Sequence, residues 1–217
     1  MSAEELIAIA QRHYPPGDSS RKGDRLLRVY GKRLEGVRRQ PIALLELGVR
    51  HGASLRLWRD YFPNATIVGL DIEPVPRLDL PNVHVFQGDQ TDPSALDRTR
   101  SAIGGGQFDV IIDDASHLGL KSKASFAHLF YRSLKASGLY FVEDIAAPLL
   151  KDWPDGAPFA SPEQGSLEGY QHGMVGFLKQ LIDEMADGVV RASRQSLIAE
   201  VAFYPNICVI RKAGDAV

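Results

Sequence analysis

The stretch that decides the fold is Phe108–His117, FDVIIDDASH, in which an apolar run typical of a buried strand ends in two carboxylates and is soon followed by a histidine. About thirty residues later, Leu139–Asp144, LYFVED, repeats the pattern of an apolar run that ends in two acids. If these runs are neighbouring parallel strands, about 4.8 Å apart, their carboxyl ends gather four acids and one histidine in one small volume.

Such a cluster carries an electrostatic cost. Its acids are Asp113, Asp114, Glu143 and Asp144, with His117 beside them. At a separation of about 5 Å and an effective dielectric constant of about 20, each pair of like charges costs roughly 3 kcal/mol. The sequence therefore predicts either that some of these acids are protonated or that a cation binds among them.

Strands and helices alternate around this stretch. Strand-like runs are expected at 42–49, 66–72, 83–86, 108–113 and 139–144, with helices at 55–61, 93–103 and 121–134. The alternation predicts an α/β fold with a Rossmann-like, doubly wound, mostly parallel sheet that binds ligands at the carboxyl ends of its strands. Two closing apolar runs, Leu197–Phe203 and Ile207–Ile210, are joined by Tyr204-Pro205-Asn206 and predict an antiparallel hairpin, which brings the sheet to seven strands.

Two helices are expected ahead of the sheet. The first begins at a capping box of Ser2 and Glu5, and the second begins near Asp24. We therefore divide the chain into an N-terminal helical segment, residues 1–40, packed on a main domain, residues 41–217. The segment 21–39 carries eight lysines and arginines against two acids. Such a run could bind an anionic ligand, but a solvated helix face is the favoured interpretation.

After the second acidic run the chain becomes rich in proline, glycine and alanine. Residues 146–166 are expected to form a long loop, which we interpret as a lid. A helix with an apolar face from Met174 to Met185 follows and is expected to end at Gly188.

Composition limits the possible functions. The 217 residues are 44% hydrophobic and 24% charged, as in an ordinary soluble domain, and the formal net charge of −2 predicts no nucleic-acid partner. The single cysteine, Cys208, excludes an internal disulfide, suits a cytoplasmic protein and is expected in the core. No signal-peptide pattern and no run of 18 apolar residues is present, so we expect no membrane span. The oligomeric state stays open, a homodimer included.

The first strand-to-helix turn, Glu46–Ser54, has the sequence ELGVRHGAS, in which Gly48 can let a ligand approach the backbone and Gly52 can form a tight turn. Arg50 stands where the dinucleotide fingerprint has its second glycine, so a pyrophosphate would fit poorly. Asp71 and Asp89 end the next two strands, where they can bind ribose hydroxyls and the adenine edge. A nucleoside without a diphosphate points to S-adenosylmethionine. The expected cofactor-binding residues are Glu46, Gly48, Gly52, Ser54, Asp71, Asp89, Gln90 and Asp113.

Several of these motifs resemble the class I S-adenosylmethionine-dependent methyltransferases, and more narrowly the metal-dependent sugar O-methyltransferases of macrolide and related glycoside pathways. The resemblance covers residues 40–145 and rests on LLELGVRHGASL at 44–55, GLDIEP at 69–74, DDASH at 113–117 and VED at 142–144. The chain departs from the usual pattern at Arg50, at Ala53 and at 145–147, so the resemblance implies the reaction and leaves the identity of the substrate open. Its length is also similar to that of 1-O-methyltransferases that act on methylated mannosides.

The resemblance implies a function for each residue of the acid cluster. It implies that Asp114, Glu143 and Asp144 bind Mg²⁺, with His117 as the catalytic base. Carboxylate ligands favour Mg²⁺ or Mn²⁺ over zinc. A sugar hydroxyl bound to that cation is easier to deprotonate, and His117 can accept its proton as the oxygen attacks the methyl group. The expected substrate is a glycoside or oligosaccharide, on whose rings Trp153, Phe159 and Tyr170 could stack unless they serve only packing.

Three other interpretations remain open at this point. A metal-dependent O-methyltransferase acting on a catechol would use the same chelation of two neighbouring oxygens. A nicotinamide oxidoreductase is disfavoured by Arg50 and by the closing hairpin. A non-catalytic adenosine-binding module would have no use for His117.

Overall fold

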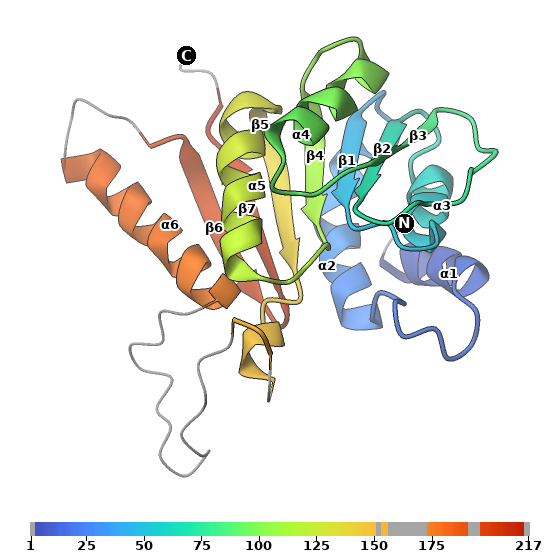
Figure 1. The fold of residues 1–217 in the computed structure, drawn as a ribbon, viewed down its shortest axis with the longest axis horizontal. Helices are drawn as coiled ribbons and strands as arrows, with labels where there is room; N and C mark the ends of the chain where they lie inside the picture. Colours follow the sequence, from blue (N-terminus) through green and yellow to red (C-terminus); the bar gives the residue numbers. More distant parts are fainter. Residues whose placement is uncertain (1–2, 151–152, 156–172, 191–195, 215–217) are drawn as a thin grey trace.

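The computed structural model describes residues 3–150, 153–155, 173–190 and 196–214. Within them the chain forms one seven-stranded sheet with the order β3-β2-β1-β4-β5-β7-β6 (Figure 1). Strands β1 to β5 are parallel, and β7 pairs antiparallel with both β5 and β6. The strands are β1 (Ala43–Leu47), β2 (Thr66–Asp71), β3 (Val83–Gln87), β4 (Phe108–Asp113), β5 (Leu134–Glu143), β6 (Ile198–Tyr204) and β7 (Ile207–Lys212). The predicted fold class is confirmed, including the C-terminal hairpin.

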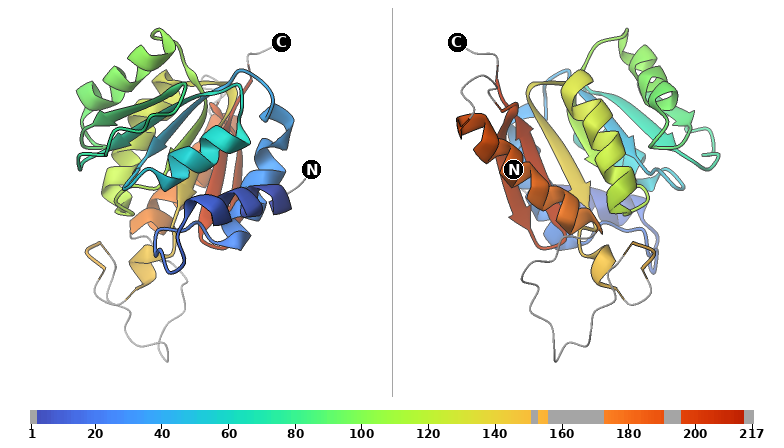
Figure 2. Two further views of the ribbon diagram at one scale, coloured as in Figure 1. Left: turned by 90° about the vertical axis from the view of Figure 1, so that its right-hand side faces the viewer. Right: turned by 60° about the vertical axis from the view of Figure 1, so that its left-hand side comes forward.

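Helices cover both faces of the sheet (Figure 2). They are α1 (Ala3–His13), α2 (Asp24–Leu34), α3 (Ala53–Tyr61), α4 (Pro93–Thr99), α5 (Gly119–Arg132) and α6 (Gly173–Val190). Alternate strand residues enter two separate cores: Leu44 and Phe141 join the core under α1, α2 and α3, whereas Leu45 and Tyr140 join the core under α4, α5 and α6. Because both faces are buried, the central strands have the nearly continuous apolar sequences of a parallel sheet.

The register of the central strands brings their polar ends together. Leu47 of β1 pairs with Asp113 of β4, and Asp113 pairs with Val142 of β5. The next residues, Asp114 and Glu143, therefore leave the sheet at the same edge. This arrangement confirms that the two acidic runs end neighbouring parallel strands.

An aromatic cluster holds α2 against this edge. The ring of Tyr30 on α2 lies 4.7 Å from the ring of Phe141 on β5 and 5.0 Å from that of Trp58 on α3, measured between centroids. All three side chains are fully buried. Such pairs contribute about 0.5–1.5 kcal/mol each beyond the burial of their area. The cluster therefore fixes the segment just before α2 close to the carboxyl ends of β4 and β5.

Some element boundaries differ from those expected. Strand β5 begins at Leu134, ahead of the expected 139, because Leu134 pairs with Phe108 before the register shifts. The expected helix at 93–103 is α4 followed by a 3₁₀ turn, Arg100–Ile103. Helix α6 continues past Gly188 to Val190, since a glycine inside a helix costs only about 1 kcal/mol. Ser2, proposed as a cap, lies outside the described residues.

The region interpreted as a lid is described only in part. A 3₁₀ turn at Ala147–Leu149 follows β5, and 153–155 are also described, whereas 156–166 lie outside the described residues. The lid therefore stays a prediction. Among the described residues no helix has the length and apolar character needed to cross a bilayer.

Several basic residues of the segment 21–39 pair with acids outside the predicted site. Arg28 pairs with Glu4, Arg38 with Glu5 and Arg33 with Glu200 through side chains. Lys22 is different, because only 1% of its side chain is exposed. This lysine enters the acid cluster described below.

Candidate active site

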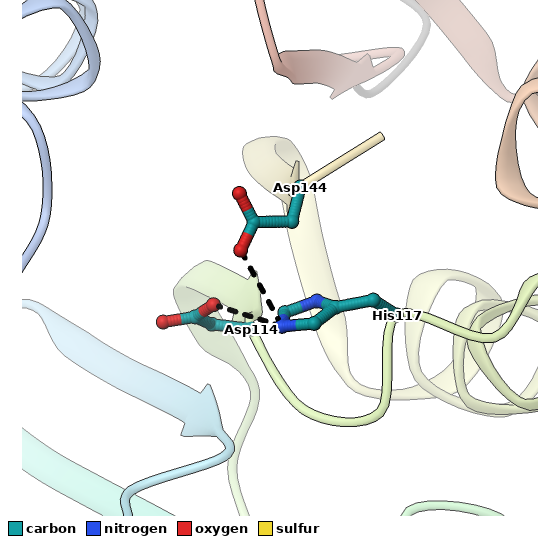
Figure 3. Close-up of side chains that lie close together, drawn as sticks. All are labelled: Asp114, His117 and Asp144. Atoms are coloured by element: carbon teal, nitrogen blue, oxygen red, sulfur yellow. Dashed lines mark ion pairs between the residues drawn. The ribbon is translucent and has the colours of Figure 1, made fainter. Parts of the chain in front are cut away.

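The ends of β4 and β5 bring together a histidine and two carboxylates (Figure 3). His117 Nε2 lies 3.4 Å from Asp144 Oδ2 and 3.9 Å from Asp114 Oδ1. His117 and Asp144 both have a φ of 52°, a left-handed conformation that is uncommon outside glycine. These backbone conformations turn the two side chains toward one another at the sheet edge.

A second group of acids lies deeper, around a lysine. Lys22 Nζ is 2.7 Å from Asp114 Oδ2 and 2.5 Å from Glu143 Oε1, and it forms a 3.3 Å ion pair with Glu46 Oε1. The Tyr30 hydroxyl also donates to Glu143 Oε1, at 2.5 Å. Asp114 therefore belongs to both groups: its Oδ2 contacts Lys22, while its Oδ1 is the oxygen nearer to His117.

The pKa values of the deeper group are shifted by burial and by its opposite charges. Burial by itself would lower the pKa of Lys22, but the carboxylates of Asp114, Glu143 and Glu46 outweigh it and hold that pKa well above its ordinary value. Burial, together with the charge of Asp114, raises the pKa of Glu143, while Lys22 and Tyr30 oppose the rise. Lys22 is therefore a permanent cation among these acids.

Sequence reasoning missed Lys22. Its position inside a run of lysines and arginines made it look like one more surface charge. The available signal was local: Lys22 directly precedes Gly23 and Asp24, where α2 begins, and the apolar face of α2 must pack on the sheet. The first residues before a buried helix can point toward the same site as the strand ends.

The predicted cofactor loop joins β1 to α3 beside the acids. Gly48 and Gly52 have φ values of 84° and 81°, so both need the conformational freedom of glycine. A Cβ on Gly48 would lie 2.1 Å from the carbonyl oxygen of Asp114. Asp71 Oδ2 accepts hydrogen bonds from the backbone N–H groups of Val49 (2.6 Å) and Arg50 (2.7 Å), which fixes the loop on the end of β2.

Two pockets meet at this loop. The larger has a volume of about 790 Å³ and includes Lys22, His117 and Asp144 in its lining, together with His51 and Ser54. The smaller, of about 130 Å³, is lined by the following residues among others: Leu70, Asp89, Gln90, Ser116 and Lys121. Gly48, Asp71 and Ala115 line both pockets, so the two are adjacent. A third groove, of about 810 Å³ along residues 74–87, contains none of the predicted site residues.

The other predicted cofactor residues divide into two classes. Asp89 lines the smaller pocket and pairs with Lys121 at 3.0 Å, while Gln90 donates to Asp113 Oδ1 at 3.2 Å. Asp113 and Glu46 are buried and line neither the larger nor the smaller pocket. Asp113 accepts the hydrogen bond of the Gln90 amide, and burial raises the pKa of Asp113.

Glu46 likewise acts inside the core. It accepts a hydrogen bond from the Ser54 hydroxyl at 2.6 Å and pairs with Lys22 on its other oxygen. The cofactor loop and the acid cluster are therefore connected through this one buried carboxylate.

The residues at the sheet edge fit a divalent cation. One oxygen each of Asp114 and Asp144, with a nitrogen of His117, lie within 4.8 Å of one another, and Glu46, Asp114 and Glu143 form a second such set. Oxygen-rich ligand sets suit Mg²⁺ and Mn²⁺. Of the three predicted ligands, Asp144 belongs to the first set and Glu143 to the second, whereas Asp114 belongs to both.

Neighbouring groups orient the histidine and the acid. The Trp153 indole N–H donates to the backbone carbonyl of His117 at 3.1 Å, and the two rings lie 6.4 Å apart. The Asn206 side chain, from the β6–β7 turn, donates to Asp144 Oδ1. His117 Nδ1 is buried and has no hydrogen-bond partner among the described residues. Phe159 and Tyr170, also considered for sugar stacking, lie outside them.

The chain has relatives among characterised proteins, although no family model matches it. It is 31% identical over 201 residues to the 8-demethyl-8-alpha-L-rhamnosyl tetracenomycin-C 2'-O-methyltransferase of Streptomyces olivaceus, covering 86% of this chain and 50% of the relative. It is 36% identical over 161 residues to the mycinamicin VI 2''-O-methyltransferase of Micromonospora griseorubida, covering 71% of this chain and 38% of the relative. The chain thus spans half or less of the length of these relatives.

A similar fold occurs in the MycE methyltransferase from the mycinamycin biosynthetic pathway, solved in complex with Mg, SAH and mycinamycin VI. The TM-score is 0.75 at 30% identity, and the match covers 98% of this chain and 56% of that chain. A second crystal form of MycE with Mg and SAH gives a TM-score of 0.76. These comparisons confirm the predicted resemblance to the sugar O-methyltransferases.

Proposed function

Because the chain is related to sugar O-methyltransferases and has a class I methyltransferase fold, we propose that it transfers a methyl group from S-adenosylmethionine to a sugar hydroxyl. The observation that carries the proposal is the junction of the two pockets at Gly48, Asp71 and Ala115, next to the acid edge of β4 and β5. A cofactor spanning this junction has its adenosine end in the smaller pocket and its methionine end in the larger one. The acceptor hydroxyl then approaches beside His117.

The smaller pocket offers groups suited to adenosine. Asp71, at the end of β2, can accept hydrogen bonds from the ribose hydroxyls, while Asp89 and Gln90 flank the adenine edge. Gly48 has no side chain, so the cofactor can pass close to the backbone. When bound, S-adenosylmethionine supplies the methyl group on an electron-poor sulfur.

The acid edge is suited to Mg²⁺ or Mn²⁺. We assign the ion to Asp114 and Asp144, with Glu143 Oε2 as a further ligand, since Lys22 and Tyr30 both contact the other oxygen, Oε1. When bound, the ion would make the sugar hydroxyl more acidic and hold it in one orientation. The similar MycE structures, solved in complex with Mg, support a role for a divalent ion.

His117 is the residue that receives the proton. Its Nε2 is directed at the acid edge, and the carboxylates of Asp114 and Asp144 stabilise the imidazolium that forms. The hydrogen bond from Trp153 to the His117 carbonyl holds the loop that carries the ring. These residues align the oxygen with the methyl group, and alignment supplies much of the rate in such a displacement.

The substrate class we propose is a glycoside or oligosaccharide with two neighbouring hydroxyls, a methylated mannoside among them. The similarity to O-methyltransferases named for a rhamnosyl tetracenomycin and for mycinamicin VI supports a sugar as the acceptor. A catechol is the second candidate, because it also presents two adjacent oxygens. A panel of glycosides and catechols with methyl-labelled cofactor distinguishes the two.

Removing the divalent cation should abolish methyl transfer without preventing cofactor binding. In excess EDTA we expect label transfer to a glycoside to fall to background and to return when Mg²⁺ is restored. Calorimetry with S-adenosylhomocysteine should show a dissociation constant changed by less than about tenfold, a difference of 1.4 kcal/mol. Sustained turnover in EDTA would exclude the metal from the reaction.

A further inference from the structure

We propose that Lys22 is a fixed internal cation that divides the acid cluster in two and stays in place when the divalent ion binds. It is a positioning residue: it holds Glu46 and one oxygen each of Asp114 and Glu143, and so leaves their other oxygens for the divalent ion beside Asp144 and His117. The inference deepens the proposed function, because it specifies how that site accepts its metal.

The contacts assign the oxygens of Asp114 to two different positions. Oδ2 lies 2.7 Å from Lys22 Nζ, and Oδ1 is the oxygen that faces His117 Nε2. Glu143 contributes Oε1 to Lys22, and Tyr30 donates to the same oxygen. Both acids are therefore held by one oxygen while the second remains available at the edge of the larger pocket.

Charge favours keeping the lysine beside a divalent ion. When ionised, Glu46, Asp114, Glu143 and Asp144 carry four formal negative charges, of which a divalent ion offsets two and Lys22 a third. Glu46 is fully buried and does not line the larger pocket. If the ammonium left, Glu46 Oε1 would lose its 3.3 Å ion pair, while Oε2 would keep the hydrogen bond from the Ser54 hydroxyl. Removing the partner of a buried charge costs several kcal/mol, so displacement of Lys22 is unfavourable.

The position of Lys22 is also fixed mechanically. Its side chain is 1% exposed, and the residues that follow it form α2, whose Tyr30 is locked between Phe141 and Trp58. Movement of the ammonium out of the cluster would have to disturb this aromatic packing or leave the charge buried elsewhere. The structure thus favours an arrangement in which the Lys22 ammonium and the divalent ion occupy neighbouring positions, over one in which they compete for the same position.

Manganese stoichiometry tests this arrangement. We expect the wild-type protein to bind one Mn²⁺ by electron paramagnetic resonance, and Lys22→Met to bind two, because the Glu46–Asp114–Glu143 set is then free to accept an ion. Lys32→Met, which removes an exposed lysine of α2, is the matched control and should bind one. A single ion bound by Lys22→Met, whether with unchanged affinity or at least tenfold more tightly, would overturn the proposal; tighter binding would mean that lysine and metal compete.

Lysine acetylation tests the same point on the wild-type protein, in case Lys22→Met does not fold. With acetic anhydride and mass spectrometry, Lys22 should be modified at less than a tenth of the rate of Lys32, both with and without saturating Mg²⁺. Modification of Lys22 that rises to the rate of Lys32 when Mg²⁺ is added would contradict the proposal. Neither measurement needs a sugar or methyl transfer, so failure here is distinguishable from failure of the proposed reaction.

Discussion

Replacing His117 with alanine should lower kcat for methyl transfer by about 10²–10⁴-fold, the contribution expected of a positioned general base. The ring nitrogen Nε2 lies 3.4 Å from Asp144 and 3.9 Å from Asp114, so the variant loses the proton acceptor whose charged form these two carboxylates stabilise. Single-turnover transfer of a labelled methyl group to a glycoside measures the effect. Binding of S-adenosylhomocysteine should change little.

A matched control separates this effect from the loss of any histidine ion pair. His128 on α5 pairs through Nε2 with Asp97 Oδ1 on α4 at 2.8 Å, and neither residue lines either pocket. His128→Ala should keep the wild-type kcat. If His117→Ala also retained a rate within a few fold of wild type, the proton would have to go elsewhere and the assigned base would be wrong.

Replacing Gly48 with alanine should weaken cofactor binding by about a hundredfold, which corresponds to roughly 2.7 kcal/mol. The new Cβ would lie 2.1 Å from the Asp114 carbonyl oxygen and 2.7 Å from the Cα of Ala115. Both are backbone atoms, so no change of side-chain rotamer can relieve the clash. The loop after β1 must therefore move away from the loop after β4. Calorimetric titration with S-adenosylhomocysteine measures the loss.

Gly105 supplies the control for this substitution. Its φ of 79° is close to the 84° of Gly48, but a Cβ there meets nothing within 4 Å. Gly105→Ala should therefore show only the backbone strain of a left-handed alanine, about 1–2 kcal/mol of stability, with cofactor affinity unchanged. Equal affinities in Gly48→Ala and Gly105→Ala would mean that the close approach of the two loops does not shape the cofactor site.

Much of this arrangement could be predicted from the sequence because its signals are local. Apolar runs such as Phe108–Asp113 mark strands buried on both faces, and acids at their ends mark the ligand edge of a parallel sheet. Gly48 and Gly52 stand where the turn needs a left-handed backbone. Each of these features depends on a few consecutive residues.

The misses depend on packing between distant segments. Lys22 looked like a surface charge because only the docking of α2 brings it to Asp114 and Glu143, 92 and 121 residues away. For Glu46, all five residues of β1 are buried, so alternation could not reveal which way its side chain faces, and its place at the cofactor stays a prediction. The early start of β5 at Leu134 was hidden because KASG at 135–138 lacks a strand pattern.

The central claim is that acids from the ends of β4 and β5 bind a divalent cation beside the cofactor. The most direct measurement is an anomalous difference map, at the manganese edge, from crystals grown with S-adenosylhomocysteine and Mn²⁺. The account predicts one strong peak within about 2.3 Å of carboxylate oxygens of Asp114 and Asp144. Clear density for the cofactor product, with no anomalous peak near these acids at saturating Mn²⁺, would contradict it.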